Sequence, residues 1–270
     1  MAKKQIKKES HKLVIAISSR ALFNLDHSHQ IFKEEGIEAY AKHQQENESA
    51  VLEPGVGFTL VKKLLKLNSK KTPIDVILLS RNSADTGLRI FNSIEHYGLN
   101  ISRAAFTRGE STHPFVGAFE ADLFLSSNYH DVQKALQSGF AAASIVESKA
   151  DNIHPSQLRI AFDGDAVIFS DESEKIFQEQ GLKAFQENEI LSENVELKAG
   201  PFKSFLASLQ KIQSTFPEKN NPIRTALVTA RSAPSHKRVI HTMREWGIRI
   251  DESFFLGGLD KGIFLREFAA

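Results

Sequence analysis

The stretch Ile160–Glu174, IAFDGDAVIFSDESE, begins as an apolar strand-like segment and then places two aspartates on either side of a glycine. The stretch Ile15–His29, IAISSRALFNLDHSH, repeats this setting with Ser18 and Arg20 in place of the two aspartates. The chain therefore carries one local pattern twice, once with the acids and once without them.

The repeat extends well beyond these segments, because two further blocks align in the same order and with little change of register. Blocks that recur in order indicate an internal duplication. The polar stretch between the two copies, residues 147–157, is the natural linker. The aligned segments are Leu13–Tyr40 with Leu158–Phe185, Pro73–Ala84 with Pro222–Ala233, and His96–Gly109 with Glu245–Gly258.

Each copy alternates short apolar runs rich in branched residues with helical patterns, which predicts a parallel sheet with helices on its faces. We therefore predict an α/β protein of two tandem Rossmann-like units with parallel sheets, and a small helical cap in the second unit. The expected parts are a disordered basic leader at 1–12, a first unit at 13–148, a linker at 149–157, and a second unit at 158–270 whose cap covers about 171–200.

Composition excludes several classes of function. The chain has 270 residues, a net charge of +1 and no cysteine. The balanced charge gives no electrostatic case for nucleic acid or a membrane surface, and no apolar run approaches the roughly 20 residues that span a bilayer. The absence of cysteine excludes disulfides and thiolate chemistry. We expect a cytoplasmic protein with neither nucleic acid nor membrane as a partner.

The polar residues of the second copy follow predicted strands, where an open parallel sheet presents its ligand site. Asp163 and Asp165 follow the first strand, and two carboxylates so placed can divide the roles of nucleophile and proton carrier and bind a cation. Thr229 ends the next strand, and the backbone after it offers phosphate donors. Lys261 lies in a glycine-rich loop, where it can neutralise a phosphate oxygen.

Two questions remain open from the residues alone. Arg231 and Arg238 either recognise a substrate or solvate the helix that follows. In the first copy, Ser18 is a poor nucleophile and Arg20 would repel a metal, so this copy is expected to be non-catalytic. It serves either as a packing platform or as an anion site at Arg20.

The ordered set resembles the haloacid dehalogenase superfamily, whose D-x-D, Ser/Thr and Lys motifs match Asp163-Gly164-Asp165, Thr229 and Lys261. RIAFDGDAVIFSDESE, LVTARSA and FLGGLDKG in the second copy, and NSADTGLRIFNSIEHYGL in the first, look like the cytosolic 5′-nucleotidase I family over nearly the whole chain. The resemblance implies Mg²⁺-dependent hydrolysis of nucleoside 5′-monophosphates, typically AMP, through an aspartyl-phosphate. It implies Asp163, Asp165, Thr229 and Lys261 as catalytic residues, Thr229, Ala230 and Arg231 as substrate-binding residues, and Asp163 and Asp165 as metal ligands.

One departure concerns the superfamily's fourth motif, an acidic pair that would follow GIFLREFAA. The repeat pairs Phe119-Glu120-Ala121 with Phe268-Ala269-Ala270, so the second copy has no counterpart of Asp122–Val146. We expect the second sheet to lack that strand, with an edge that self-association could cover in a homo-oligomer. The alternatives are a catalytically impaired nucleotide-binding or regulatory protein, or a phosphatase of another small phosphate ester.

Overall fold

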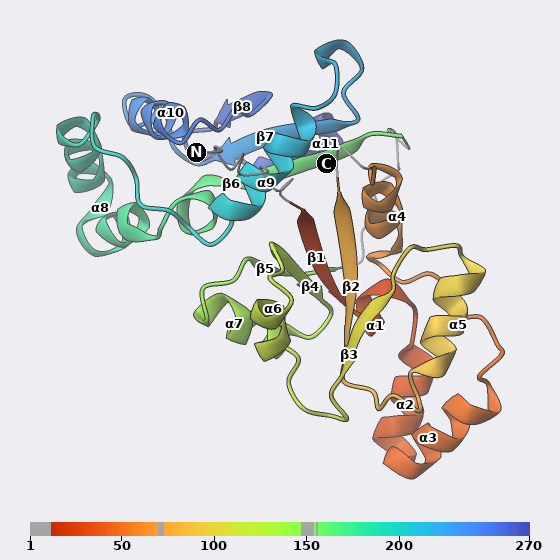
Figure 1. Ribbon diagram of the computed structural model, residues 1–270. Coiled ribbons are helices and arrows are strands. Elements are labelled where there is room, and N and C mark those ends of the chain that lie inside the picture. Colours follow the sequence, from red (N-terminus) through yellow and green to blue (C-terminus); the bar gives the residue numbers. More distant parts are fainter. Residues whose placement is uncertain (1–11, 70–72, 147–153, 155) are drawn as a thin grey trace, which may run out of the picture.

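The computed structural model describes residues 12–69, 73–146, 154 and 156–270, arranged around two parallel sheets (Figure 1). The predicted leader, except Lys12, and most of the predicted linker lie outside the described residues. None of the described helices combines the length and hydropathy of a bilayer-spanning segment.

The first sheet has five parallel strands in the order β3-β2-β1-β4-β5, which confirms the predicted α/β fold. All seven residues of β2 are buried, as expected of a parallel strand covered on both faces. The strands are β1 (Leu13–Ser18), β2 (Ile74–Ser80), β3 (Arg103–Phe106), β4 (Leu123–Ser126) and β5 (Ala142–Ser144). The helices are α1 (Ser19–Leu22), α2 (Asp26–Glu35), α3 (Ile37–Glu46), α4 (Phe58–Lys66), α5 (Leu88–His96), α6 (Pro114–Ala118) and α7 (Tyr129–Gln137).

The second sheet has three parallel strands in the order β6-β7-β8. Within the described residues, β6 pairs only with β7, whereas its counterpart β1 pairs with both β2 and β4. The elements are β6 (Leu158–Asp163), the turn η1 (Gly164–Ile168), α8 (Glu172–Leu191), α9 (Lys203–Gln213), η2 (Glu218–Asn220), β7 (Ile223–Thr229), α10 (His236–Glu245), β8 (Glu252–Phe255) and α11 (Lys261–Phe268).

The duplication extends to individual hydrogen bonds. In the first unit the backbone N–H of Leu52 donates to the Ser93 hydroxyl over 3.0 Å. At the matching positions the N–H of Leu197 donates to the Thr242 hydroxyl, also over 3.0 Å. The two units therefore share a contact that ties the segment before α4 to α5, and the segment before α9 to α10.

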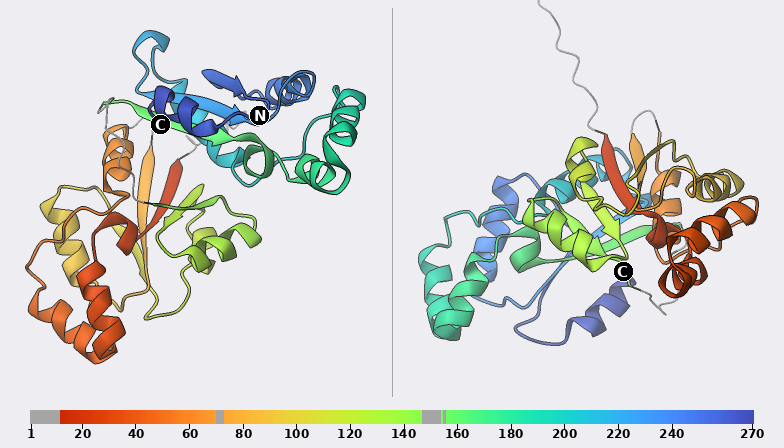
Figure 2. Two further views of the ribbon diagram at one scale, coloured as in Figure 1. Left: turned by 180° about the vertical axis from the view of Figure 1, so that it is seen from behind. Right: turned by 90° about the horizontal axis from the view of Figure 1, so that it is seen from below.

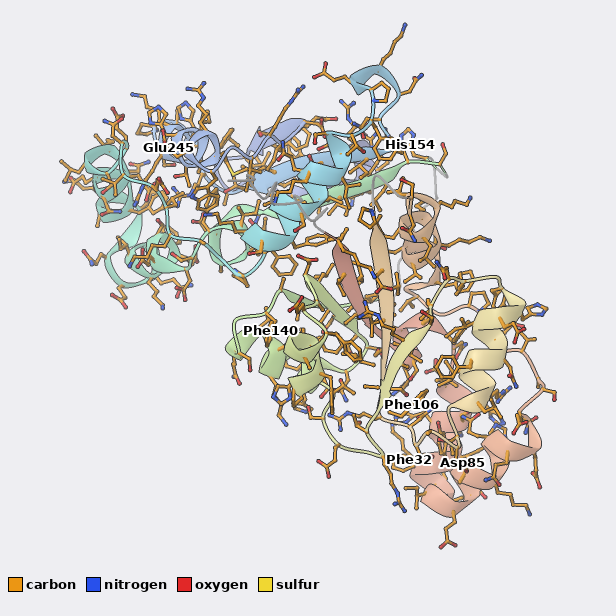
Figure 3. All side chains as sticks on the ribbon, in the orientation of Figure 1. Phe32, Asp85, Phe106, Phe140, His154 and Glu245 are labelled. Carbon is orange, nitrogen blue, oxygen red and sulfur yellow. The ribbon has the colours of Figure 1, made fainter. Side chains whose placement is uncertain are left out.

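The units pack reciprocally on one another. Helix α4 of the first unit contacts β6, and its counterpart α9 contacts β1. Buried side chains of both units form one continuous core. This exchange of equivalent elements is the pattern of a two-fold interface. It leaves the helices α2 and α3 and the helix α8 at opposite ends of the molecule (Figures 1 and 2), and Phe32 of α2 lies at the end away from the second sheet (Figure 3).

The helical cap predicted for the second unit has a counterpart in the first. Helix α8 is broken at Gly181, whose φ is 82°, and Gly36, with a φ of 90°, separates α2 from α3 in the same way. Both glycines combine positive φ with ψ near 180°, a conformation that is essentially restricted to glycine.

Gly181→Ala is therefore expected to lower the free energy of unfolding by about 1–3 kcal/mol, through backbone strain alone. No atom lies within 4 Å of the Cβ that alanine would add, so a steric clash is excluded. Urea unfolding of this variant and of Gln180→Ala, an exposed neighbour, measures the difference. Equal stability of the two variants would contradict the strained backbone.

Candidate active site

The two aspartates lie where β6 gives way to the turn η1. Asp163 is the last residue of the strand, and Asp165 follows in an extended conformation. Between them Gly164 is buried against β7: a Cβ on this residue would lie 3.1 Å from the Thr229 Oγ1 atom. Glycine is favoured here, because a Cβ would be in tight contact with the Thr229 side chain on the neighbouring strand.

Thr229 ends β7, one position beyond the residue that pairs with Asp163. Its hydroxyl accepts a hydrogen bond from the Arg231 backbone N–H over 3.2 Å and is buried. Lys261 begins α11, and its Nζ atom lies 2.6 Å from Asp163 Oδ2. The structure thus brings the four residues predicted to be catalytic to one edge of the sheet.

Arg231, which the resemblance implies as a substrate-binding residue, lies buried beside Asp165. Its guanidinium is 3% exposed and donates two hydrogen bonds to Asp165, at 2.9 and 2.7 Å. A third hydrogen bond goes to Glu189. Burial opposes the charge, but the hydrogen bonds and charges of Asp165 and Glu189 outweigh it and raise the pKa of Arg231. Ala230, the other predicted substrate-binding residue, is exposed.

Glu189 is a site residue that sequence reasoning missed. It lies on α8, is 1% exposed, and accepts hydrogen bonds from the Ser173 hydroxyl at 2.8 Å and from Arg238 at 2.9 Å. Arg238 therefore does not solvate its helix, since it is largely buried and paired. The repeat could have indicated a structural role for Arg238, because it pairs this arginine with Arg89 of the first copy.

The matching edge of the first unit is filled by its own contacts. The Ser18 hydroxyl accepts from the backbone N–H groups of Ala21 and Ser127, at 3.3 and 3.4 Å. Arg20 donates to Asp26 over 3.0 Å, and Thr112, at the position of Lys261, is buried. The contacts of Ser18 fit the packing platform, whereas the Arg20 side chain is still 41% exposed, so both alternatives stay predictions.

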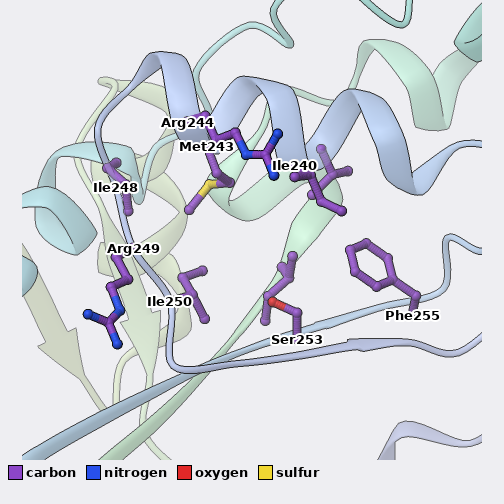
Figure 4. A pocket seen from close by; sticks show the side chains of 10 residues that line it. Ile240, Met243, Arg244, Ile248, Arg249, Ile250, Ser253 and Phe255 are labelled. Atoms are coloured by element: carbon purple, nitrogen blue, oxygen red, sulfur yellow. The ribbon is translucent and has the colours of Figure 1, made fainter.

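An apolar groove lies between α10 and β8 (Figure 4). Met243, Ile248, Ile250 and Phe255 contribute to its lining, and none of the four predicted catalytic residues does. The groove is therefore separate from the aspartate site.

The donors at the site fit a hard cation only in part. Magnesium in proteins is commonly held by one or two carboxylates together with substrate phosphate, which is the chemistry that Asp163 and Asp165 offer. Within the described residues no group of three or more His, Cys, Asp or Glu is placed to hold a metal. All four oxygens of the two aspartates accept hydrogen bonds, from Gly164, Lys261 and Arg231.

The parallel α/β fold thus places an aspartate pair, a threonine and a lysine at one edge of the second sheet. The 5′-nucleotidase family model matches residues 5–270. The chain belongs to the 5′-nucleotidase family. It is 40% identical over 272 aligned residues to Cytosolic 5'-nucleotidase 1B of Homo sapiens, an alignment that covers 96% of this chain and 45% of the relative. The chain thus spans less than half the length of that relative, and no solved structure matches it.

Replacing Thr229 by valine is expected to destabilise the second unit by about 1–3 kcal/mol, because the buried Arg231 N–H loses its acceptor. Thr229→Ser keeps the hydroxyl and is the matched control. Chemical unfolding compares the two variants, and an equal loss of stability in both would show that the hydroxyl is not the cause.

Proposed function

We propose that the second unit hydrolyses nucleoside 5′-monophosphates, with AMP as the model substrate. The observation that carries this proposal is the meeting of Asp163, Asp165, Thr229 and Lys261 at the carboxyl edge of β6 and β7. The human relative is named a cytosolic 5′-nucleotidase, which supports the substrate class and a cytoplasmic location.

In this proposal a carboxylate oxygen of Asp163 attacks phosphorus and forms an aspartyl-phosphate as the bond to the 5′ oxygen breaks. Asp165 gives a proton to the leaving 5′ oxygen, for which one of its two oxygens must first release its hydrogen bond from Arg231 and take up that proton. It then takes a proton from the water that attacks the aspartyl-phosphate, which releases phosphate and restores Asp163. Thr229 and Lys261 hold the phosphoryl oxygens.

Magnesium is the proposed cofactor, held by Asp163 and Asp165, and when bound it would offset charge on the phosphoryl oxygens. Lys261 already neutralises Asp163 in this structure, so the lysine must share that carboxylate with the cation or turn to the phosphate. Its side chain is 36% exposed and has room to do so. The first unit, with Ser18 and Arg20, is proposed to be non-catalytic.

A second candidate is a nucleotide-binding or regulatory protein with impaired turnover. The observation in its favour is that Arg231 occupies both oxygens of Asp165, while no three-ligand metal group forms within the described residues. In a third candidate the same residues act on another small phosphate ester.

Asp163→Asn is expected to lower phosphate release from AMP by at least about a thousandfold, because an amide cannot replace the attacking carboxylate. The control is Asp171→Asn, an exposed residue paired with Lys175, which should retain wild-type turnover. Activity of Asp163→Asn within tenfold of wild type would remove Asp163 from its role. AMP binding without turnover in the wild-type chain would favour the second candidate.

Removal of divalent cations is expected to abolish turnover, and added Mg²⁺ to restore it, because the proposed site must gather three phosphoryl oxygens and two carboxylates. Phosphate release is measured in Mg²⁺, in chelator, and after Mg²⁺ is added back. Undiminished release in chelator would contradict the proposed cofactor.

A further inference from the structure

A buried carboxylate joins the cap to the aspartate site. Glu189 of α8 accepts hydrogen bonds from Arg231 and Arg238, so one fully buried acid has two guanidinium partners. A buried carboxylate is tolerated only when it is paired and hydrogen-bonded, and Ser173 supplies a further donor at 2.8 Å.

Arg231 uses the other side of its guanidinium for Asp165. Nε and Nη2 donate to the two oxygens of Asp165, while Nη1 donates to Glu189. The planar fork fixes both contacts at once, because the five N–H groups of arginine diverge in one plane. The Arg231 Cζ atom lies over the ring of Phe185, also on α8, at 5.3 Å from the ring centroid.

Comparison with the first unit shows which contact of Arg238 is common to both units. Arg238 donates through Nε to the carbonyl of Val195 over 2.8 Å. Its counterpart Arg89 donates through Nε to the carbonyl of Ala50, also over 2.8 Å. This tether is present in both units and is therefore independent of the aspartates.

The Glu189–Arg231–Asp165 chain has no such counterpart. The matching residues of the first unit are Gln44, Asn82 and Arg20. Asn82 accepts a hydrogen bond from Tyr40 at 2.8 Å, and Arg20 is paired with Asp26 instead. Among the described residues, only the second unit, which carries the aspartate pair, has a continuous run of charges from α8 to Asp165.

We propose that Glu189 is a positioning residue: it holds the Arg231 guanidinium in the orientation in which Arg231 fixes the carboxylate of Asp165, so that cap placement and acid–base geometry depend on one another. The catalytic part of this statement rests on the proposed hydrolysis. The positioning of Arg231 does not, and can be measured separately.

The variant that tests this is Glu189→Gln, which gives position 189 the same residue type as its counterpart in the first unit, Gln44. In wild type the Arg231 Nε–Hε NMR signal, assigned by its loss in Arg231→Lys, is expected to be sharp and protected from exchange with water. In Glu189→Gln it is expected to broaden or exchange. Glu187→Gln, on the same helix and exposed beside Lys183, is the matched control and should leave the signal unchanged. A sharp, protected signal in Glu189→Gln would overturn the proposal.

Steady-state hydrolysis of AMP then tests the consequence. Glu189→Gln is expected to lower kcat by about 10- to 100-fold, the scale of a misplaced catalytic group, with KM changed less than about threefold. The double variant Glu189→Gln, Arg231→Lys should lose no more than the worse single variant, since both act through one contact. A raised KM with unchanged kcat, or additive losses, would overturn the positioning role.

Two further outcomes, a wild type that does not hydrolyse AMP and a variant that does not fold, have separate interpretations. If wild type does not hydrolyse AMP but the NMR signal responds to Glu189→Gln, the proposed function fails and the positioning of Arg231 stands. If Glu189→Gln does not fold, Ser173→Ala removes one donor to Glu189 and should broaden the Arg231 signal while the melting temperature remains close to wild type. An unchanged signal in that folded variant would overturn the proposal.

Discussion

The site depends on the parallel pairing of β6 with β7. This register sets Asp163 opposite Val228 and leaves Thr229 one residue further along the adjacent strand. Because parallel strands end at the same edge of a sheet, their following residues meet there. Gly164 permits the approach, since a Cβ would crowd Thr229, and the turn can then carry Asp165 towards Arg231.

Reciprocal packing of the two units explains how one duplicated pattern can serve two purposes. Since α4 lies on β6 and α9 on β1, each unit completes the core of the other. The replacement of the aspartate pair by Ser18 and Arg20 in the first unit removes none of those contacts. At the matching edge of the first sheet, the Ser18 hydroxyl accepts hydrogen bonds from two backbone N–H groups. The first unit also keeps the helices α2 and α3, which correspond to α8.

The buried charges of the second unit impose a constraint of a different kind. Glu189, Arg231 and Arg238 are nearly inaccessible to water, and a buried ion pair often contributes little net stability compared with an apolar replacement. Removing one partner of such a pair leaves an uncompensated buried charge, so these pairs constrain where α8 can lie relative to Arg231. Helix α8 is thus positioned relative to Asp165 by contacts that allow few alternative arrangements.

The sequence by itself determined the α/β class, the internal repeat, and the meeting of Asp163, Thr229 and Lys261, because strand periodicity and the common edge of parallel strands depend on local order along the chain. Only the tertiary structure decided the sheet order, the reciprocal packing of the units, and the partners of Arg231. Glu189 and Asp165 reach that arginine from a helix and a turn far apart in sequence, and no local pattern records which buried charges will face one another.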